Sequence, residues 1–102
     1  MIHVLALVTT HPGRRAEVLK IFRGNIPAVT AEEGCIEYGP AIDAESGGIG
    51  TELGPDTFCV IEKWESLAAL QAHATAPHMR DYAAKVKDML ASRVIHVLTE
   101  PG

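Results

Sequence analysis

The sequence predicts an α+β fold in which strands and helices follow the order β-α-β-β-α-β. Three observations support this prediction. Short runs rich in β-branched and aliphatic residues lie near both ends and in the middle of the chain. Between them, apolar residues recur at helical spacing, and glycine and proline clusters separate the runs. With 102 residues, of which 47% are apolar, the chain is long enough for a single domain over residues 1–102.

The first half of the chain predicts a strand, a helix and a second strand. Residues 2–9 (IHVLALVT) are apolar on both faces and too few for a free-standing helix. Over residues 14–33, apolar side chains recur at steps of three and four, which predicts one helix. Pro27 lies inside this helix and predicts a kink, and Gly34 is placed to cap its end. Residues 35–43 then form the second strand.

The second half predicts a strand, an interrupted helix and a last strand. Residues 57–64 alternate as a strand does, and Ser66 is a good N-cap for the helix that follows. Pro77 interrupts this helix and restarts it, with an apolar stripe that we expect to reach Leu90. Residues 93–99 form the last strand. This order of elements is that of the ferredoxin-like split unit.

The long connection at residues 44–56 holds four glycines and a proline. Loops of this length in a small domain often border a binding site. We therefore expect a pocket between the sheet and the helices, with this loop as its roof.

The sheet predicts a homodimer. Two helices can cover only one face of a four-stranded antiparallel sheet. The other face carries too many Leu, Ile and Val side chains to remain in water. We expect two sheets to pack face to face as a dimeric α+β barrel.

Charge and composition exclude several classes of partner. Thirteen acidic and nine basic residues give a net charge of −4 without a basic cluster, which excludes a nucleic-acid partner. The apolar stretches are too short to span a membrane. The first charges follow the N-terminal apolar run, an order unlike a signal peptide, so we expect a cytoplasmic protein. Across the predicted hairpin Cys35 lies opposite Trp64 and Cys59 opposite Pro40, too far apart for a disulfide.

Three motifs carry a family resemblance. They are EEGC at residues 32–35, EKWES at residues 62–66 and AHATAPHM at residues 72–79. In this order and spacing they resemble the antibiotic-biosynthesis monooxygenase superfamily, and within it the YgiN-type quinol monooxygenases. The resemblance implies a dimeric ferredoxin-like fold that oxidises a small aromatic substrate, a quinol or phenol, with molecular oxygen. It implies neither metal nor flavin, so no cofactor is expected.

Other activities remain open. The same subfamily resembles enzymes that isomerise a phosphorylated breakdown product of a quorum signal, so an isomerase of a small phosphorylated ketone is an alternative. A non-enzymatic dimeric small-molecule binder is another. The haem-degrading branch has an asparagine in its first strand, which residues 2–9 lack, although Trp64 and His73 resemble two of its residues. The antibiotic-tailoring branch expects an asparagine on the strand at residues 57–64, where none occurs.

Two histidines are the main catalytic candidates. His73 lies near the buried side of its helix, where burial favours a neutral ring that can accept a phenolic proton as general base. Its alternative role is that of a hydrogen-bonded core histidine. His78 could orient a substrate oxygen or face solvent in the first helical turn. The pair is five residues apart across Pro77, whereas helical zinc pairs favour a spacing of four, and no third ligand is evident, so no metal site is predicted.

Four further residues are candidates for substrate binding. Glu62 shares a strand face with Trp64 and could hold an imidazole tautomer, although a salt bridge with a basic residue at the strand end is the favoured interpretation. Trp64 could stack on an aromatic substrate or belong to the core. Tyr38 and Tyr82 could donate hydrogen bonds to a quinol oxygen or be structural.

Overall fold

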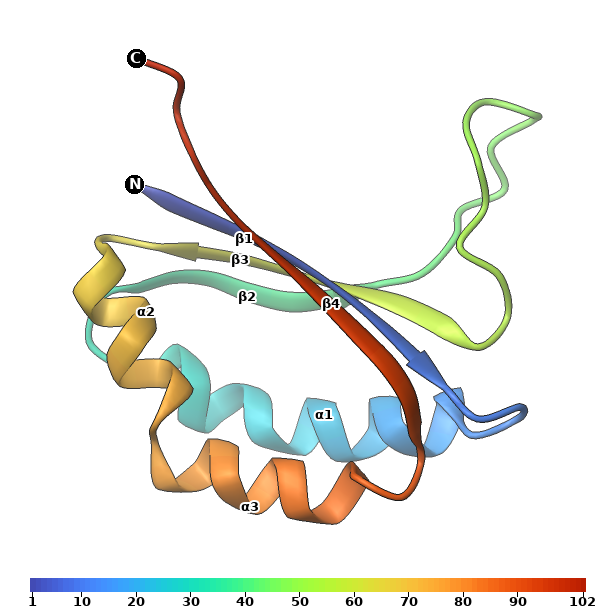
Figure 1. Cartoon of the computed structure of the whole chain (residues 1–102), viewed down its shortest axis with the longest axis horizontal. Helices are drawn as coiled ribbons and strands as arrows, with labels where there is room; N and C mark the ends of the chain where they lie inside the picture. The colour runs from blue at the N-terminus through green and yellow to red at the C-terminus, as the bar shows by residue number, and fades with distance from the viewer.

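The computed structural model describes residues 1–102 and shows a four-stranded sheet with all helices on one of its faces (Figure 1). The strands are antiparallel and lie in the order β2-β3-β1-β4, which confirms the predicted ferredoxin-like arrangement. In chain order the elements are β1 (Ile2–Thr10), α1 (Arg15–Thr30), β2 (Cys35–Ala41), β3 (Thr57–Trp64), α2 (Leu67–Ala74), α3 (Pro77–Val86) and β4 (Leu90–Thr99).

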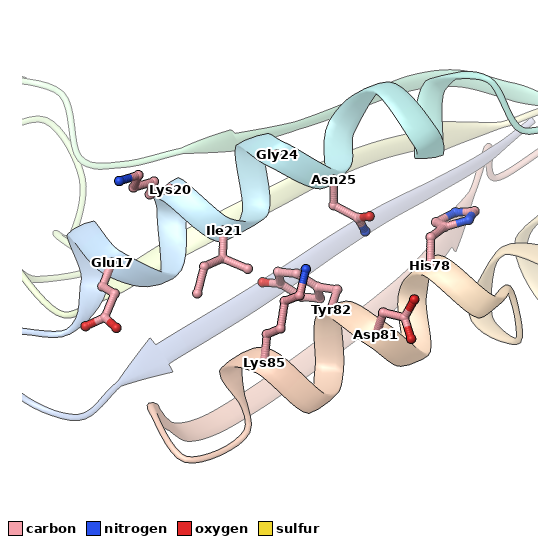
Figure 2. Close-up of a pocket in the computed structure, with 9 residues that line it drawn as sticks. All are labelled: Glu17, Lys20, Ile21, Gly24, Asn25, His78, Asp81, Tyr82 and Lys85. Atoms are coloured by element: carbon pink, nitrogen blue, oxygen red, sulfur yellow. The ribbon is translucent and has the colours of Figure 1, made fainter.

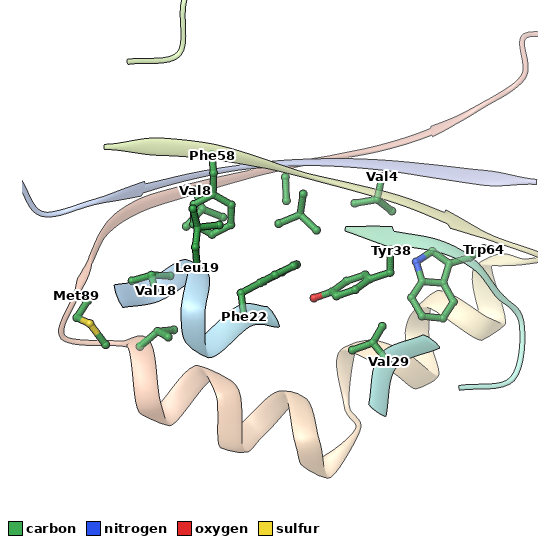
Figure 3. Close-up of a cluster of buried hydrophobic side chains, with 13 residues drawn as sticks. Val4, Val8, Val18, Leu19, Phe22, Val29, Tyr38, Phe58, Trp64 and Met89 are labelled. Carbon is green, nitrogen blue, oxygen red and sulfur yellow. The ribbon is translucent and has the colours of Figure 1, made fainter. Parts of the chain in front are cut away.

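The two central strands place alternate side chains in the core. On β1, Val4, Ala6 and Val8 are buried. The same alternation along β3 buries one set of side chains from Phe58 to Trp64, as period-two geometry predicts. Figure 3 shows the resulting core, in which Phe22 of α1 lies beneath the sheet.

Aromatic rings join α1 to the sheet. Phe22 stacks on Tyr38 of β2 with 5.2 Å between ring centroids and an interplanar angle of 16°. Its ring also meets Phe58 and Tyr82 edge-on, at 5.8 and 5.9 Å. Offset-stacked and edge-to-face pairs at these separations are favourable. This cluster therefore fixes α1 against β2, β3 and α3.

The helix α1 is shorter than predicted. It ends at Thr30, with Ala31 as its C-cap, rather than at residue 33, and the N–H of Glu32 bonds to the carbonyl of Val29 in the turn that follows. Gly34 is the last residue of this turn, three residues after the C-cap Ala31, so its predicted role as the helix cap is wrong. Its φ of +84° favours glycine, and a Cβ at this position would lie 2.6 Å from the Cβ of Ala69 on α2. Gly34 thus permits a close approach between this turn and α2.

The second helical region is broken in two. The hydroxyl of Ser66 accepts a hydrogen bond from the N–H of Ala69 at 3.1 Å, which confirms the predicted N-cap of α2. Ala76 is extended, with φ −64° and ψ 142°, and Pro77 is the first residue of α3. A residue before proline is biased to this extended conformation, so Pro77 explains the break. It changes the direction of the chain between the two histidines.

The end of α3 also differs from its prediction. The helix ends at Val86, and Leu90 belongs to β4, which begins three residues earlier than expected. Leu90 pairs with Thr10 of β1 beyond an irregularity in the ladder. The spacing of Leu90 also suits a helix, but its pairing with β1 makes it part of the strand, so a tertiary contact overrides the local pattern.

The loop at residues 44–56 does not roof the pocket between the sheet and the helices, contrary to the prediction. Figure 1 shows it projecting from the end of the sheet that is opposite α2. β2 ends at Ala41, two residues before its predicted end. The carboxylate of Asp43 accepts hydrogen bonds from the N–H groups of Leu53 and Gly54, both at 2.8 Å, and these close the base of the loop. Its tip is exposed, with Ile49 83% accessible.

The outer face of the sheet is apolar and uncovered. Leu5, Val94 and Leu98 lie on it and are exposed. The helices therefore cover one face only, as predicted. None of the three helices combines the length and apolar character needed to cross a bilayer.

Both cysteines are free thiols. Cys35 lies opposite Trp64, as predicted, but Cys59 lies opposite Ala41 rather than Pro40. An irregularity between Cys35 and Glu37 shifts the register by one residue.

Candidate active site

The main cavity lies between the inner face of the sheet and helices α2 and α3. Its volume is about 520 Å³, and most of its lining side chains are apolar. Four lining residues carry groups suited to acid–base or hydrogen-bonding chemistry, namely Tyr38, Glu62, His73 and Tyr82. A mostly apolar cavity of this size with a few polar groups is typical of small-molecule sites.

Glu62 is a buried carboxylate in the wall of this cavity. It is only 7% exposed, and its Oε1 accepts a hydrogen bond from Trp64 Nε1 at 2.9 Å. Burial raises the pKa of Glu62, while the indole N–H and the nearby His73 oppose that rise. No lysine or arginine forms the expected salt bridge with this carboxylate, and the basic group within 4 Å of it is the His73 ring, at 3.9 Å. The hydrogen-bond partner of Glu62 is the indole of Trp64, on the same strand face.

Trp64 lies outside this cavity and contacts two of the residues that line it, Glu62 and His73. Its side chain is fully buried and does not line the cavity, which corrects the expectation that it contacts substrate. Its ring lies 4.7 Å from the His73 ring, centroid to centroid. Trp64 therefore positions Glu62 through a hydrogen bond and His73 through packing.

His73 is buried, at 5% exposure, and lines the cavity from α2. On the inner side of α2, His73 is buried and Ala69 and Leu70 are half-buried, whereas Leu67 and Ala74 are exposed. The Nε2 of His73 lies 3.9 Å from Glu62 Oε1. The Nε2 side of the His73 ring therefore faces Glu62, which also lines the cavity.

Glu32 holds the opposite side of the His73 ring, and it was not among the candidates that the sequence pattern suggested. Its Oε2 lies 2.8 Å from His73 Nδ1 and 2.9 Å from His78 Nε2. A carboxylate only accepts hydrogen bonds, so each imidazole donates its N–H to this oxygen. With the proton on Nδ1, the Nε2 of neutral His73 carries the free lone pair.

Only one weak signal in the sequence marks Glu32. The residue belongs to the EEGC motif, but it lies 41 residues before His73, and no local pattern joins the two. The turn after α1 brings them together. This carboxylate is also the third potential metal ligand that the spacing of the histidines did not reveal.

His78 faces a different hollow. It does not line the main cavity but a second, mostly polar groove of about 540 Å³ between α1 and α3. Figure 2 shows His78 projecting from α3 toward α1, near Asn25. The structure thus separates the two histidines, with His73 at the cavity, His78 at the groove and Glu32 between them.

The two tyrosines reach the cavity from opposite walls. Tyr38 of β2 is buried, and its ring lies edge-on to His73 with centroids 5.5 Å apart. Burial raises the pKa of Tyr38 strongly and that of Tyr82 to about 12. Both phenols are therefore neutral near pH 7 and remain hydrogen-bond donors.

Three basic side chains also line the cavity. They are Arg80 on α3, Lys87 just beyond it and Arg93 on β4. None of them forms an ion pair with an acidic group of the chain. They are thus available to an anionic group of a ligand.

Comparison with known proteins identifies the family of this chain. Residues 1–85 match the family described as "Antibiotic biosynthesis monooxygenase". The chain belongs to the antibiotic biosynthesis monooxygenase family. It is 39% identical over 104 residues to the Escherichia coli K12 protein named "Probable quinol monooxygenase YgiN", covering all of this chain and 99% of that protein. YcnE of Bacillus subtilis, also named as a monooxygenase, is 29% identical over 98% of this chain and 97% of its own length.

Solved structures agree with this family assignment at the level of fold. Rv0793 from Mycobacterium tuberculosis superimposes with a TM-score of 0.80 over 99% of this chain and 95% of its own, at 24% identity. A crystal structure described as an antibiotic biosynthesis monooxygenase gives 0.81 over the whole of both chains, at 19% identity. Membership of the family makes this chain a monooxygenase-type enzyme.

Proposed function

We propose that this protein is a cofactor-independent monooxygenase that oxidises quinols or related phenols with molecular oxygen, using His73 as the general base. The observation that carries the proposal is the state of His73. It is a buried imidazole in the cavity wall, whose Nδ1 is held by Glu32 and whose Nε2 lies 3.9 Å from Glu62, another residue of that wall. The relative named as a quinol monooxygenase supports this substrate class.

The first step is a proton transfer. His73 Nε2 accepts the proton of a substrate hydroxyl, leaving a phenolate and an imidazolium ion. The Glu32 carboxylate, 2.8 Å from Nδ1, stabilises this imidazolium as the acidic residue of a catalytic triad does. The phenolate is more electron-rich than the phenol, so it reacts more readily with oxygen.

The remaining reaction balances without an added reductant. One oxygen atom forms a bond to the quinol ring, and the other leaves as water with two hydrogens from the substrate. The quinol becomes a hydroxyquinone, losing four electrons, and molecular oxygen gains the same four. Tyr38 and Tyr82, both neutral donors in the cavity wall, can hydrogen-bond the substrate oxygens.

Oxygen consumption tests the assignment of the base. Purified, chelator-treated enzyme is supplied with a naphthoquinol, and His73→Gln is compared with wild type. General-base catalysis contributes about 10²–10⁴-fold, so we expect turnover to fall by at least about 100-fold. His11→Gln is the matched control, because His11 is exposed in the turn after β1. Turnover of His73→Gln equal to that of the control would remove the assigned base.

The basic side chains of the cavity favour a second candidate, an isomerase of a small phosphorylated ketone. Arg80, Lys87 and Arg93 would bind the phosphate, and His73 and Glu62 would move protons at the carbon next to the carbonyl. Calorimetric titration with inorganic phosphate tests this alternative. Phosphate binding that is lost in Arg93→Gln would support it, and absence of binding to wild type would rule it out.

A non-enzymatic binder has less support. That class would have a cavity plugged by apolar side chains, with His73 outside it. Here His73 and Glu62 both reach an open cavity, which instead supports catalysis.

The uncovered sheet face supports the homodimer that the sequence predicts. Leu5, Val94 and Leu98 would be buried between two sheets, where apolar burial stabilises association. Light scattering on the purified protein tests this interface. We expect a dimer for wild type and a monomer for Leu98→Asp, and a wild-type monomer would contradict it.

A further inference from the structure

Glu32, His73 and His78 form a cluster that the proposed reaction uses only in part. One oxygen and two ring nitrogens from these residues all lie within 4.8 Å of one another. The three side chains come from three elements, namely the turn after α1, helix α2 and helix α3. Two imidazoles and one carboxylate are a ligand set that divalent first-row transition metals such as zinc and cobalt bind.

Two of the three distances between ligand atoms lie close to those of a zinc site, and the third, between the two ring nitrogens, is within 4.8 Å. Glu32 Oε2 lies 2.8 and 2.9 Å from the two ring nitrogens. Zinc binds such ligands at about 2.0–2.1 Å, which in a tetrahedron places the ligand atoms about 3.3 Å apart. The carboxylate therefore needs to withdraw by about half an ångström. His78 is in the first turn of α3 and its side chain is 28% exposed, so it can turn toward an ion.

The surroundings place a carboxylate near the remaining nitrogen of His73, although at 3.9 Å it is beyond hydrogen-bond distance. A ligating imidazole usually gives its remaining N–H to a carboxylate or a carbonyl. His73 Nε2 has Glu62 Oε1 at 3.9 Å, and Trp64 fixes that carboxylate by its indole hydrogen bond. On the other side, His78 borders the polar groove of Figure 2, through which water could complete the coordination.

We propose that Glu32, His73 and His78 form a binding site for a divalent transition-metal ion of the zinc and cobalt class. The ion binds through Glu32 Oε2, His73 Nδ1 and His78 Nε2, with the remaining position open to water. The ion takes the place of the proton on His73 Nδ1, and the single proton of the neutral ring moves to Nε2, which then has no free lone pair. If His73 is the base of the proposed function, the bound ion prevents it from accepting a proton and inhibits the enzyme. Only this inhibition rests on the proposed function; the metal site itself does not.

Cobalt binding tests the site directly. Chelator-stripped protein is titrated with Co²⁺, and its visible absorption is followed. We expect saturation at one ion per chain, displacement by Zn²⁺ and a higher midpoint of thermal unfolding with metal. Glu32→Gln and His78→Gln should each weaken Co²⁺ binding by at least about tenfold, since even the outer partners of metal ligands contribute 10–100-fold. The control His11→Gln should bind as wild type does.

Ring nitrogen signals give a second measurement that needs no variant. In long-range ¹H–¹⁵N spectra of the wild type, Zn²⁺ should shift Nδ1 of His73 and Nε2 of His78 and leave the ring of His11 unchanged. Absence of Co²⁺ binding, equal binding by all variants, or unshifted His73 and His78 nitrogens would each overturn the site.

These readouts are independent of turnover. Failure of metal binding therefore leaves the proposed oxidation standing. Zinc binding without loss of oxygen consumption keeps the metal site and rejects His73 as the base.

Discussion

Gly34 offers a sharp test of how the chain positions its site. It lies in the turn that carries Glu32, its carbonyl accepts a hydrogen bond from the N–H of Glu65, and it approaches α2 at Ala69. Replacing it with alanine adds one methyl group at a φ of +84°, where that methyl would lie 2.6 Å from the Cβ of Ala69. Gly13 is a matched control, with a φ of +80° and no atom within 4 Å of the position that a Cβ would occupy.

The two substitutions separate backbone strain from steric contact. The left-handed backbone costs a non-glycine residue about 1–2 kcal/mol, and this cost applies equally to Gly13→Ala and Gly34→Ala. Overpacking a well-packed site adds about 1–3 kcal/mol, and only Gly34→Ala incurs it. We therefore expect Gly34→Ala to lower the free energy of unfolding by about 2–5 kcal/mol, against about 1–2 kcal/mol for Gly13→Ala. The entropy that alanine removes from the unfolded chain is the same in both variants and cancels.

Urea denaturation of both variants and wild type measures these differences. One protein concentration is used throughout, because subunit association would add a concentration-dependent term. In the assay of the proposed quinol oxidation, the turnover of Gly34→Ala should also fall more than that of Gly13→Ala, since moving α2 away from the turn lengthens the contact between Glu32 and His73. Equal losses of stability in the two variants would refute the reasoning, because the contact with Ala69 would then carry no cost.

Three further predictions concern other parts of the chain. Trp64→Phe removes the hydrogen-bond donor to buried Glu62 and leaves a void. We therefore expect the free energy of unfolding, measured by urea denaturation, to fall by about 2–4 kcal/mol, and a fall of less than about 1 kcal/mol would contradict this prediction. Two backbone N–H groups lower the pKa of Asp43 in the folded chain. The ionised Asp43 therefore stabilises the loop fully at pH values above the ordinary aspartate pKa, and this stabilisation is lost as the pH falls through the lowered pKa. Hydrogen-exchange protection of those two amides should fall with it, and should be low at neutral pH in Asp43→Ala. Burial and the nearby Glu32 raise the pKa of the Cys35 thiol, so iodoacetamide should modify it more slowly than free cysteine at neutral pH, and a faster reaction would refute this.

The fold was largely predictable because its signals are local. The alternation along residues 57–64, the Ser66 cap and the break at Pro77 each follow from a few neighbouring residues, and the structure confirms them. The errors fall where distant contacts decide. Leu90 joins β4 because Thr10 of β1 pairs with it, which no helical stripe reveals.

The site was predictable only in part. The histidine on the buried side of α2 follows from helical spacing, and the structure places His73 there. Glu32 could not be found in the same way, because its partners lie 41 and 46 residues away and only the turn before Gly34 brings it to them. Trp64 was expected at the cavity because an aromatic side chain at a junction suits both a core and a ligand. The local sequence does not separate these two roles.

The break between α2 and α3 changes how a histidine pair can be encoded. In a continuous helix, side chains five residues apart point about 140° away from each other, so one carboxylate could not reach both rings. Here the extended Ala76 and the following Pro77 reorient the second helix, and His73 and His78 meet at a single oxygen of Glu32. Searches of related sequences for such pairs should therefore accept a spacing of five when a proline lies immediately before the second histidine. A design that straightens this segment into one helix would need to move the second histidine to a different position.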